Sequence, residues 1–268
     1  MDYLICTTER TGSSLLADAL SRTSGVGNPL ELLHPHSMAQ LRARHALATI
    51  AERADNASLM DRDSGVIPMV AKTFTSSLTG AKVHWSHLEQ LATHAQSWYD
   101  RSPAPAALLD EVFPGVRRHI WLSRRDRVRQ AVSLLRAETS GRWGWFDGDP
   151  PNDSGLTYPE PEQVERTIER LDRHDDAWRQ YFIERGLAPL RLNYEDLVKS
   201  YELSVCRVLE YLGSRLPAGY SVPPPRMRRQ ADSWSDAAVA RFRGVCRNES
   251  VADQEVTVVS EQMTDGHR

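Results

Sequence analysis

The residues best suited to chemistry lie near the N-terminus, where an apolar run breaks into a segment rich in hydroxyl groups. The run is Tyr3-Leu4-Ile5-Cys6, and the segment is Thr7-Thr8-Glu9-Arg10-Thr11-Gly12-Ser13-Ser14. At Gly12 the backbone can approach an anion closely, and the two serines bring hydroxyl donors. Residues 15–20 then continue as a helix, whose first N–H groups carry the positive end of its dipole. The pattern predicts a strand, a tight loop and a helix, with a loop suited to holding a phosphate.

This loop lacks the lysine that nucleotide triphosphatases use. Their motif, Gly-x-x-x-x-Gly-Lys-Ser/Thr, places the lysine on the terminal phosphates and a hydroxyl on Mg²⁺. Here Ser13 follows Gly12, and the cation, Arg10, stands two residues before the glycine. A cation ahead of Gly-Ser-Ser resembles the 5′-phosphosulfate loop of sulfotransferases that use 3′-phosphoadenosine 5′-phosphosulfate (PAPS). The resemblance implies that Arg10, Thr11, Gly12, Ser13 and Ser14 bind the donor. The alternative is an ordinary turn with a solvated arginine.

A second basic segment is suited to the 3′-phosphate of the same donor. Residues 122–126 end a predicted strand and open a helix, and Ser133 follows nine residues after Arg124. Helical geometry brings the serine hydroxyl back toward the arginine, so that both can bind one phosphate. In cytosolic sulfotransferases the spacing is commonly eight, which leaves Arg125 as the alternative partner. A solvated helix start is the other interpretation.

Strand-like and helix-like segments alternate along the rest of the chain, as in a parallel sheet covered by helices. We predict strands over 80–85, 118–123 and 189–193. We predict helices over 38–54, from 127 onward with one apolar face, over 162–185, and over 235–247. The last helix is expected to be capped by Ser235, with Asp236 in its first turn. The stretch 144–161 has four prolines and three glycines, which predicts a loop, lid or acceptor wall.

Composition sets the limits of this interpretation. The 268 residues suffice for one large α/β domain, expected over residues 1–247, with a polar tail over 248–268. The net charge of −3 and pI near 6.3 argue against a general nucleic-acid binder. No signal peptide is evident and no apolar run approaches the ~20 residues of a membrane span, so we expect a cytoplasmic protein. Cys6, Cys206 and Cys246 are odd in number and far apart, which predicts neither disulfides nor zinc.

Taken in order, five segments resemble the bacterial trehalose 2-sulfotransferase family. They are Glu9 to Leu16, Gly27-Asn28-Pro29-Leu30-Glu31, Gly80 to Trp85, Arg124 to Ala137, and Arg229-Gln230-Ala231-Asp232 through Arg241. The resemblance implies a P-loop-type three-layer α/β fold, with a central mainly parallel sheet flanked by helices. It also implies PAPS as donor, a carbohydrate hydroxyl as acceptor and commonly a homodimer. The mechanism expected for this transfer requires no metal.

Two catalytic residues are expected, one from the chemistry of the transfer and one from the resemblance. Sulfuryl transfer is an in-line displacement in which charge grows on the bridging oxygen of the leaving 3′,5′-ADP, and a fixed cation there stabilises the transition state. Arg10 is our candidate for that cation. The family's general base is a glutamate placed as Glu31 is here, and a positioned base contributes about 10²–10⁴-fold. His34 and His36 are the rival bases, because histidine titrates near neutral pH.

The acceptor side departs from the family pattern. Family members carry Gly-Glu-Pro-Gln-Glu-Phe-Phe around the base, whereas this chain has Gly-Asn-Pro-Leu-Glu-Leu-Leu-His. We expect trehalose or a related sugar, with a glycolipid or a glycosylated natural product as the alternative. The candidate acceptor residues are Glu31, His34, Lys82 and Trp85. Trp85, Trp143 and Trp145 are either sugar-stacking surfaces or core.

Near the C-terminus, Arg229 and Gln230 are expected to close over the nucleotide, as the family's basic segment does. The run Arg226-Met227-Arg228-Arg229 is equally typical of an exposed basic turn. Two other classes of protein remain open. A small-molecule kinase would need a Walker lysine, which the loop lacks, and a non-catalytic nucleotide-binding module would need no base.

Overall fold

The computed structural model describes residues 2–23, 25–34, 80–99, 103–144, 155–214, 219–227 and 231–245. The chain divides into two compact units, Met1–Arg125 with Asp172–Arg226, and Asp126–Leu171 with Met227–Arg268. A single domain over 1–247 stays a prediction. The predicted helix over 38–54 and the polar tail lie outside the described residues.

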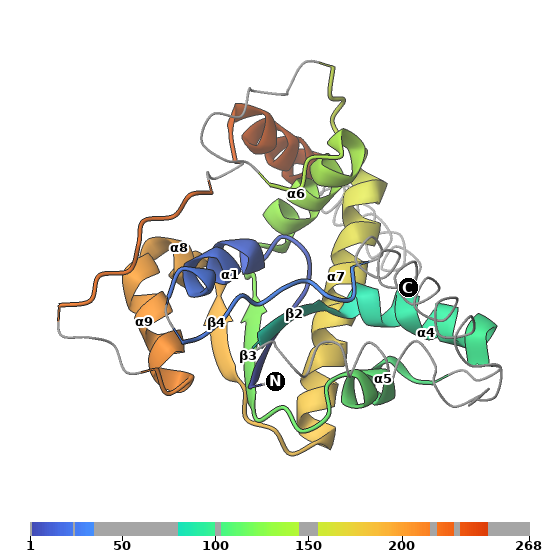
Figure 1. The fold of residues 1–268 in the computed structure, drawn as a ribbon. Helices are drawn as coiled ribbons and strands as arrows, with labels where there is room; N and C mark the ends of the chain where they lie inside the picture. The colour runs from blue at the N-terminus through green and yellow to red at the C-terminus, as the bar shows by residue number, and fades with distance from the viewer. Residues whose placement is uncertain are drawn as a thin grey trace, which may run out of the picture. The chain divides into compact units, whose positions relative to one another are not determined.

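A four-stranded parallel sheet forms the centre of the first unit (Figure 1). Its strands are β1 (Tyr3–Thr7), β2 (Gly80–His84), β3 (Arg118–Ser123) and β4 (Leu190–Asn193), in the order β2-β1-β3-β4. Each neighbouring pair is parallel. The predicted strands are therefore confirmed, with the one over 80–85 ending at His84.

Helices cover both faces of this sheet, because successive residues of a strand point to opposite sides. Tyr3 and Ile5 pack against α1 (Ser13–Ser21), α8 (Tyr194–Lys199) and α9 (Tyr201–Tyr211). Leu4 and Cys6 pack against α4 (Trp85–Tyr99), α5 (Pro105–Val112) and the C-terminal part of α7 (Pro161–Glu184). Figure 1 shows α1, α8 and α9 on one side of the sheet and α4 and α5 on the other. The three-layer α/β fold is confirmed.

The carboxyl ends of three strands meet at one edge of the sheet. In register, Thr7 of β1 stands beside His84 of β2 and Leu122 of β3. The segments that leave these strands are therefore gathered together, which is where parallel α/β sheets bind ligands. They contain the Gly12 loop, the start of α4 and Arg124.

The second unit has a small core of its own. It contains α6 (Arg127–Ser140), the N-terminal part of α7 and a helix over 233–245. Val132, Val164 and Val239 are among the buried residues that these helices share. Asp126 caps α6, since its side chain accepts the N–H of Arg129 at 3.0 Å.

The prediction of Ser235 as a helix cap is wrong. The helix begins at residue 233, and Asp232 Oδ1 accepts the backbone N–H of Ser235 at 3.1 Å. The same carboxylate is held by Arg136, with an Nη2–Oδ2 distance of 2.8 Å. Aspartate is a strong N-cap in its own right, and the Arg136 ion pair adds a partner from a distant segment that local pattern does not reveal.

Replacing Asp232 by alanine is expected to lower the free energy of unfolding by about 1–2 kcal/mol, because the helix loses its cap. Asparagine keeps the capping oxygen and removes only the charge, so Asp232→Asn is expected to cost less. Equilibrium urea unfolding at neutral pH measures both values. Equal losses in the two variants would contradict a capping role.

The stability contributed by Asp232 is also expected to depend on pH. Burial alone would raise the pKa of its carboxyl, but hydrogen bonds from Arg136 and Ser235 outweigh burial and hold the pKa at about 2. A lowered folded-state pKa stabilises the fold above the unfolded value of about 3.9. This contribution is lost as pH falls from there through about 2, so the difference between wild type and Asp232→Asn should shrink over that range.

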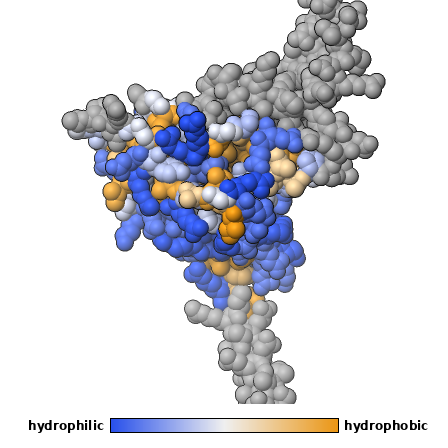
Figure 2. All heavy atoms as spheres, turned by 90° about the horizontal axis from the view of Figure 1, so that it is seen from below, coloured by the Kyte–Doolittle hydropathy of each residue, from blue (hydrophilic) through white to orange (hydrophobic). Residues whose placement is uncertain are grey.

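The described surface seen in Figure 2 is mainly hydrophilic, with separated apolar spots. Among the described residues, no helix has the length and apolar character needed to cross a membrane. The large apolar side chains that are exposed include Leu30, Trp143 and Tyr158.

Candidate active site

The loop between β1 and α1 is held in shape by threonine hydroxyls. Thr7 Oγ1 and Thr11 Oγ1 lie 2.5 Å apart, and Thr11 Oγ1 donates to the Thr8 carbonyl at 3.1 Å. Thr11 is fully buried, so its hydroxyl faces the interior of the loop rather than a ligand. Donor binding by Thr11 stays a prediction, in which its backbone rather than its hydroxyl would contact the ligand.

Two residues of the loop have positive φ angles, Arg10 at 62° and Gly12 at 80°. Gly12 is the N-cap of α1, so the N–H groups of the first turn have no partner within the helix. A Cβ atom at Gly12 would lie 2.8 Å from Cδ2 of Tyr194. A residue with a side chain would therefore displace either the loop or this ring.

Arg124 reaches the same loop from the end of β3. Its Nη1 donates to the carbonyl oxygen of Arg10 at 3.1 Å, and its guanidinium lies 4.4 Å from the centre of the Tyr194 ring. Arg125 instead faces solvent, where it forms an ion pair with Asp196 at 2.6 Å. The geometry therefore favours Arg124 over Arg125 as the arginine that serves the loop.

Glu31 lies against the edge strand β2. A parallel bridge joins Leu30 to Ala81, and the N–H of Lys82 donates to the Leu30 carbonyl at 2.9 Å. The Glu31 carboxylate meets Lys82 Nζ at 2.5 Å, His84 Nε2 at 3.6 Å and His87 Nδ1 at 3.7 Å. Lys82 and His84 share one face of β2, and His87 follows in the first turn of α4.

Lys82 connects this carboxylate to the anion loop, because its Nζ also donates to Ser14 Oγ at 3.1 Å. The predicted base and the predicted donor loop thus share one buried cation. This contact is the central feature of the site.

The charge state of Glu31 follows from its neighbours. Burial alone would raise the pKa of its carboxyl, but the charge that His84 carries when protonated, and then the charge and hydrogen bond of Lys82, outweigh burial and hold the pKa at about 2. Burial lowers the pKa of His84 below its ordinary value, and burial together with His84 lowers that of His87 to about 4. At neutral pH both imidazoles are therefore uncharged, and Lys82 is the cation that holds Glu31.

A second carboxylate stands behind His84. Glu9 Oε1 accepts a hydrogen bond from the Ser86 hydroxyl and lies 4.0 Å from His84 Nδ1. The His84 ring therefore lies between Glu31 and Glu9, and it stacks on His87 with ring centres 5.0 Å apart. Sequence reasoning missed Glu9, His84 and His87. The alternation of Lys82 and His84 along a strand was the available signal.

The remaining acceptor candidates differ in their surroundings. His34 is exposed, with its ring 5.3 Å from that of His87. Trp85 is 7% exposed and packs edge-on against Trp178, so of the two interpretations left open it belongs to the core. Trp143 is half exposed in the second unit.

The remaining donor candidates lie in the second unit or outside the described residues. Ser133 lies in α6, within the second unit, and its pairing with Arg124 stays a prediction. Arg229, Gln230, His36 and Trp145 lie outside the described residues.

Glu31, His84 and His87 offer ligand atoms within 4.8 Å of one another, a donor set of the kind that zinc accepts. The carboxylate, however, is already neutralised by Lys82. A divalent ion would have to compete with this lysine, so the arrangement suits an ion pair at an anion site better than a metal centre.

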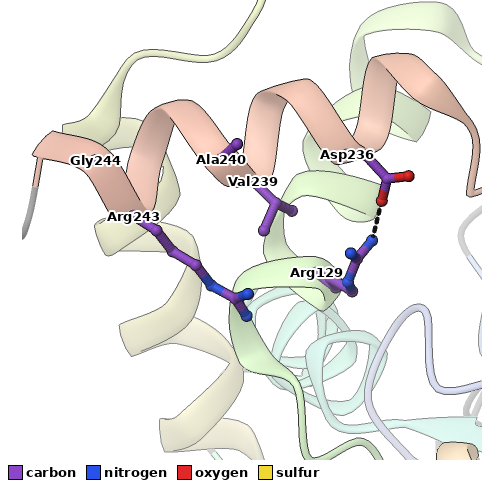
Figure 3. Close-up of a pocket in the computed structure, with 6 residues that line it drawn as sticks. All are labelled: Arg129, Asp236, Val239, Ala240, Arg243 and Gly244. Atoms are coloured by element: carbon purple, nitrogen blue, oxygen red, sulfur yellow. Dashed lines mark hydrogen bonds and ion pairs between the residues drawn. The ribbon is translucent and has the colours of Figure 1, made fainter.

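A separate pocket lies in the second unit, between α6 and the helix over 233–245 (Figure 3). Its lining residues are Arg129, Asp236, Val239, Ala240, Arg243 and Gly244. Arg129 is paired with Asp236 at 2.6 Å, and Arg243 approaches Asp126 at 3.4 Å. Their charges are neutralised, and none of the site residues predicted from the sequence lines the pocket.

A parallel α/β sheet with an anion loop, a cation and a carboxylate at its carboxyl edge is the arrangement expected of an enzyme that transfers an anionic group. The family model described as Stf0 sulphotransferase matches residues 2–244, so the chain belongs to this family. It is therefore a sulfotransferase, and the family predicted from five sequence segments is confirmed.

Curated relatives extend over nearly the same length. The chain is 28% identical over 255 residues to the trehalose 2-sulfotransferase of Mycobacterium tuberculosis, covering 90% of this chain and 94% of that protein. It is also 28% identical over 258 residues to the trehalose 2-sulfotransferase of Mycolicibacterium smegmatis, with the same coverage.

Similarity to solved structures is weaker. A sulfotransferase from Alicyclobacillus acidocaldarius aligns with 91% of this chain and 94% of its own, with a TM-score of 0.44 and 13% identity. The sulfotransferase domain from the Curacin biosynthetic pathway covers 90% and 97%, with a TM-score of 0.45 and 15% identity. The family assignment rests on the sequence match.

Proposed function

We propose that this enzyme transfers the sulfuryl group of PAPS to a hydroxyl group of a carbohydrate, with Glu31 as general base. The observation that carries the proposal is the Lys82 ammonium, which contacts both the Glu31 carboxylate and Ser14 of the anion loop. The proposed proton acceptor and a cation therefore stand beside the loop that would hold the anion. The family and the two trehalose 2-sulfotransferase relatives support the same reaction.

PAPS would supply the sulfuryl group and a leaving group, 3′,5′-ADP. The N–H groups of the first turn of α1, with the Ser13 and Ser14 hydroxyls, would hold the 5′-phosphosulfate. Arg10 would stabilise the charge that grows on the bridging oxygen. Glu31 would take the proton of the attacking hydroxyl as its oxygen bonds to sulfur and the bond from sulfur to the bridging oxygen breaks. No step in this scheme requires a metal.

Arg124 would bind the 3′-phosphate, because it is the buried arginine that contacts the loop. A guanidinium pairs well with phosphate oxygens. Ser133, Arg229 and Gln230 would complete this site.

The homodimer and the cytoplasmic location also stay predictions.

Trehalose or a related sugar is the proposed acceptor, by likeness to the two relatives. One observation favours the alternative, a glycolipid or a glycosylated natural product. Leu30, next to the proposed base, is 43% exposed, whereas Leu32 and Leu33 are buried. An exposed aliphatic side chain beside Glu31 suits an acceptor that carries an apolar part.

The proposal predicts that the enzyme binds 3′,5′-ADP in EDTA much more tightly than 5′-ADP, because only the former carries the 3′-phosphate. Arg124→Ala is expected to weaken 3′,5′-ADP binding by about 10–100-fold, as for a charge-assisted contact. Its neighbour provides the control, since Arg125→Ala should change the affinity little. Isothermal titration calorimetry measures the affinity of the wild type for both nucleotides and that of each variant for 3′,5′-ADP. Equal affinity for both nucleotides would contradict PAPS as donor and favour a kinase or an inert nucleotide-binding module.

A further inference from the structure

Lys82 holds two parts of the site at once. Its side chain is 7% exposed, and its Nζ lies 2.5 Å from Glu31 Oε2 and 3.1 Å from Ser14 Oγ. A buried ammonium needs anionic or strongly polar partners, because leaving it unpaired away from water is costly. In this state Glu31 is the anionic partner.

The placement of Lys82 follows from the sheet. It stands opposite Ile5 of β1 in the parallel register, two residues before β2 ends. Its side chain shares the strand face of His84, which is the face that α1 covers at Ile5. The ammonium therefore reaches Ser14, in the first turn of α1, and an anion bound at that turn would lie within its range.

A base held by a lysine is a poor base. General-base catalysis works best when the pKa of the base lies near the working pH, and protonated His84 together with Lys82 holds the pKa of Glu31 at about 2. His84 and His87 face the same carboxylate, and Glu9 lies behind His84. Burial leaves both imidazoles uncharged at neutral pH, so neither would replace Lys82 as the counter-ion.

We propose that the sulfuryl group of the donor draws Lys82 away from Glu31, so that the base is released only when the donor is in place. The inference rests on the proposed function and gives Lys82 a catalytic part in it. The ammonium would then neutralise the sulfuryl oxygens while Glu31 accepts the hydroxyl proton. As the products leave, Glu31 returns that proton to solvent and pairs again with Lys82. Donor binding and base activation are thereby one event.

In this exchange Glu31 and the sulfuryl group of PAPS compete for Lys82. The affinity for PAPS, measured at equilibrium without turnover, therefore tests it. Glu31→Gln removes the anion that competes for Lys82, so PAPS, with no acceptor present, is expected to bind about 10-fold more tightly. The gain should be smaller for 3′,5′-ADP, which has no sulfuryl group. In a Lys82→Met background the same Glu31→Gln change should no longer strengthen PAPS binding. Lys199→Met, an exposed lysine of α8, serves as the control and should leave the gain intact.

Titration calorimetry of Glu31→Gln in the wild-type, Lys82→Met and Lys199→Met backgrounds, each compared with its own background and with both nucleotides, decides the matter. An equal gain for the two nucleotides, no gain, or a gain that persists in Lys82→Met would overturn the exchange. Glu31→Gln is isosteric, so its comparison of PAPS with 3′,5′-ADP remains decisive even if Lys82→Met proves unstable by circular dichroism. Failure of the wild type to bind PAPS at all is a different result, which would contradict the proposed function itself.

Discussion

Glu31→Gln is expected to lower kcat with PAPS and a saturating sugar acceptor by about 10²–10⁴-fold, the usual contribution of a positioned base. Glutamine keeps the size and the hydrogen-bonding oxygen of the side chain but cannot take a proton. The loss should fall on kcat, and the KM for PAPS should not rise, because Glu31 does not bind the donor but competes with it for Lys82. Measurement of initial rates with radiolabelled PAPS separates the two constants.

A matched control is available in Glu202→Gln, since Glu202 is an exposed glutamate of α9 far along the chain. Its rate should equal that of the wild type. A fall of less than about 10-fold in Glu31→Gln would show that another group is the base. His84 would then be the first residue to test, because its Nε2 lies 3.6 Å from Glu31 and it has a second carboxylate behind it.

Local pattern accounts for much of the fold. The apolar run 3–6, the glycine and the amphipathic segments each predict an element from neighbouring residues alone, and β1, β3, α7 and β4 are found within about two residues of the expected ends. Helices α4, α5, α8 and α9 were not predicted. For the helix over 233–245, the Arg136 ion pair that strengthens the Asp232 cap comes from almost a hundred residues away and leaves no local signal.

The site is less predictable than the fold. The sequence singled out Glu31, Lys82 and the loop residues. In the structure, the Lys82 ammonium contacts both the Glu31 carboxylate and Ser14 of the loop. The histidines were missed because their relevance depends on the Leu30–Ala81 bridge, which sets Glu31 against a strand some fifty positions later in the chain. Spacing along β2 places Lys82 and His84 on one face. Only the tertiary structure shows that the Glu31 carboxylate contacts both of them and His87.

The second large effect is expected at Gly12. Substitution by alanine should weaken 3′,5′-ADP binding by about 100-fold or more, because the N–H groups of the loop would no longer point at the anion. Two penalties combine at this position. A φ of 80° costs a residue with a Cβ about 1–2 kcal/mol, and the Cβ would lie 2.8 Å from the Tyr194 ring. Moving the Tyr194 ring away would also disturb Arg124, because its guanidinium packs over the ring at 4.4 Å.

Gly186→Ala separates the two penalties. Gly186 has a φ of 61°, and a Cβ there would meet nothing within 4 Å, so alanine should lower the free energy of unfolding by about 1–2 kcal/mol without affecting nucleotide binding. Gly12→Ala should lower it further and also weaken binding, as measured by urea unfolding and calorimetry. If both variants lost the same stability and neither lost affinity, the close approach of Gly12 to Tyr194 would have no part in holding the anion loop. Loss of affinity at Gly12 alone would tie donor binding to the contact that joins α8, Arg124 and the loop.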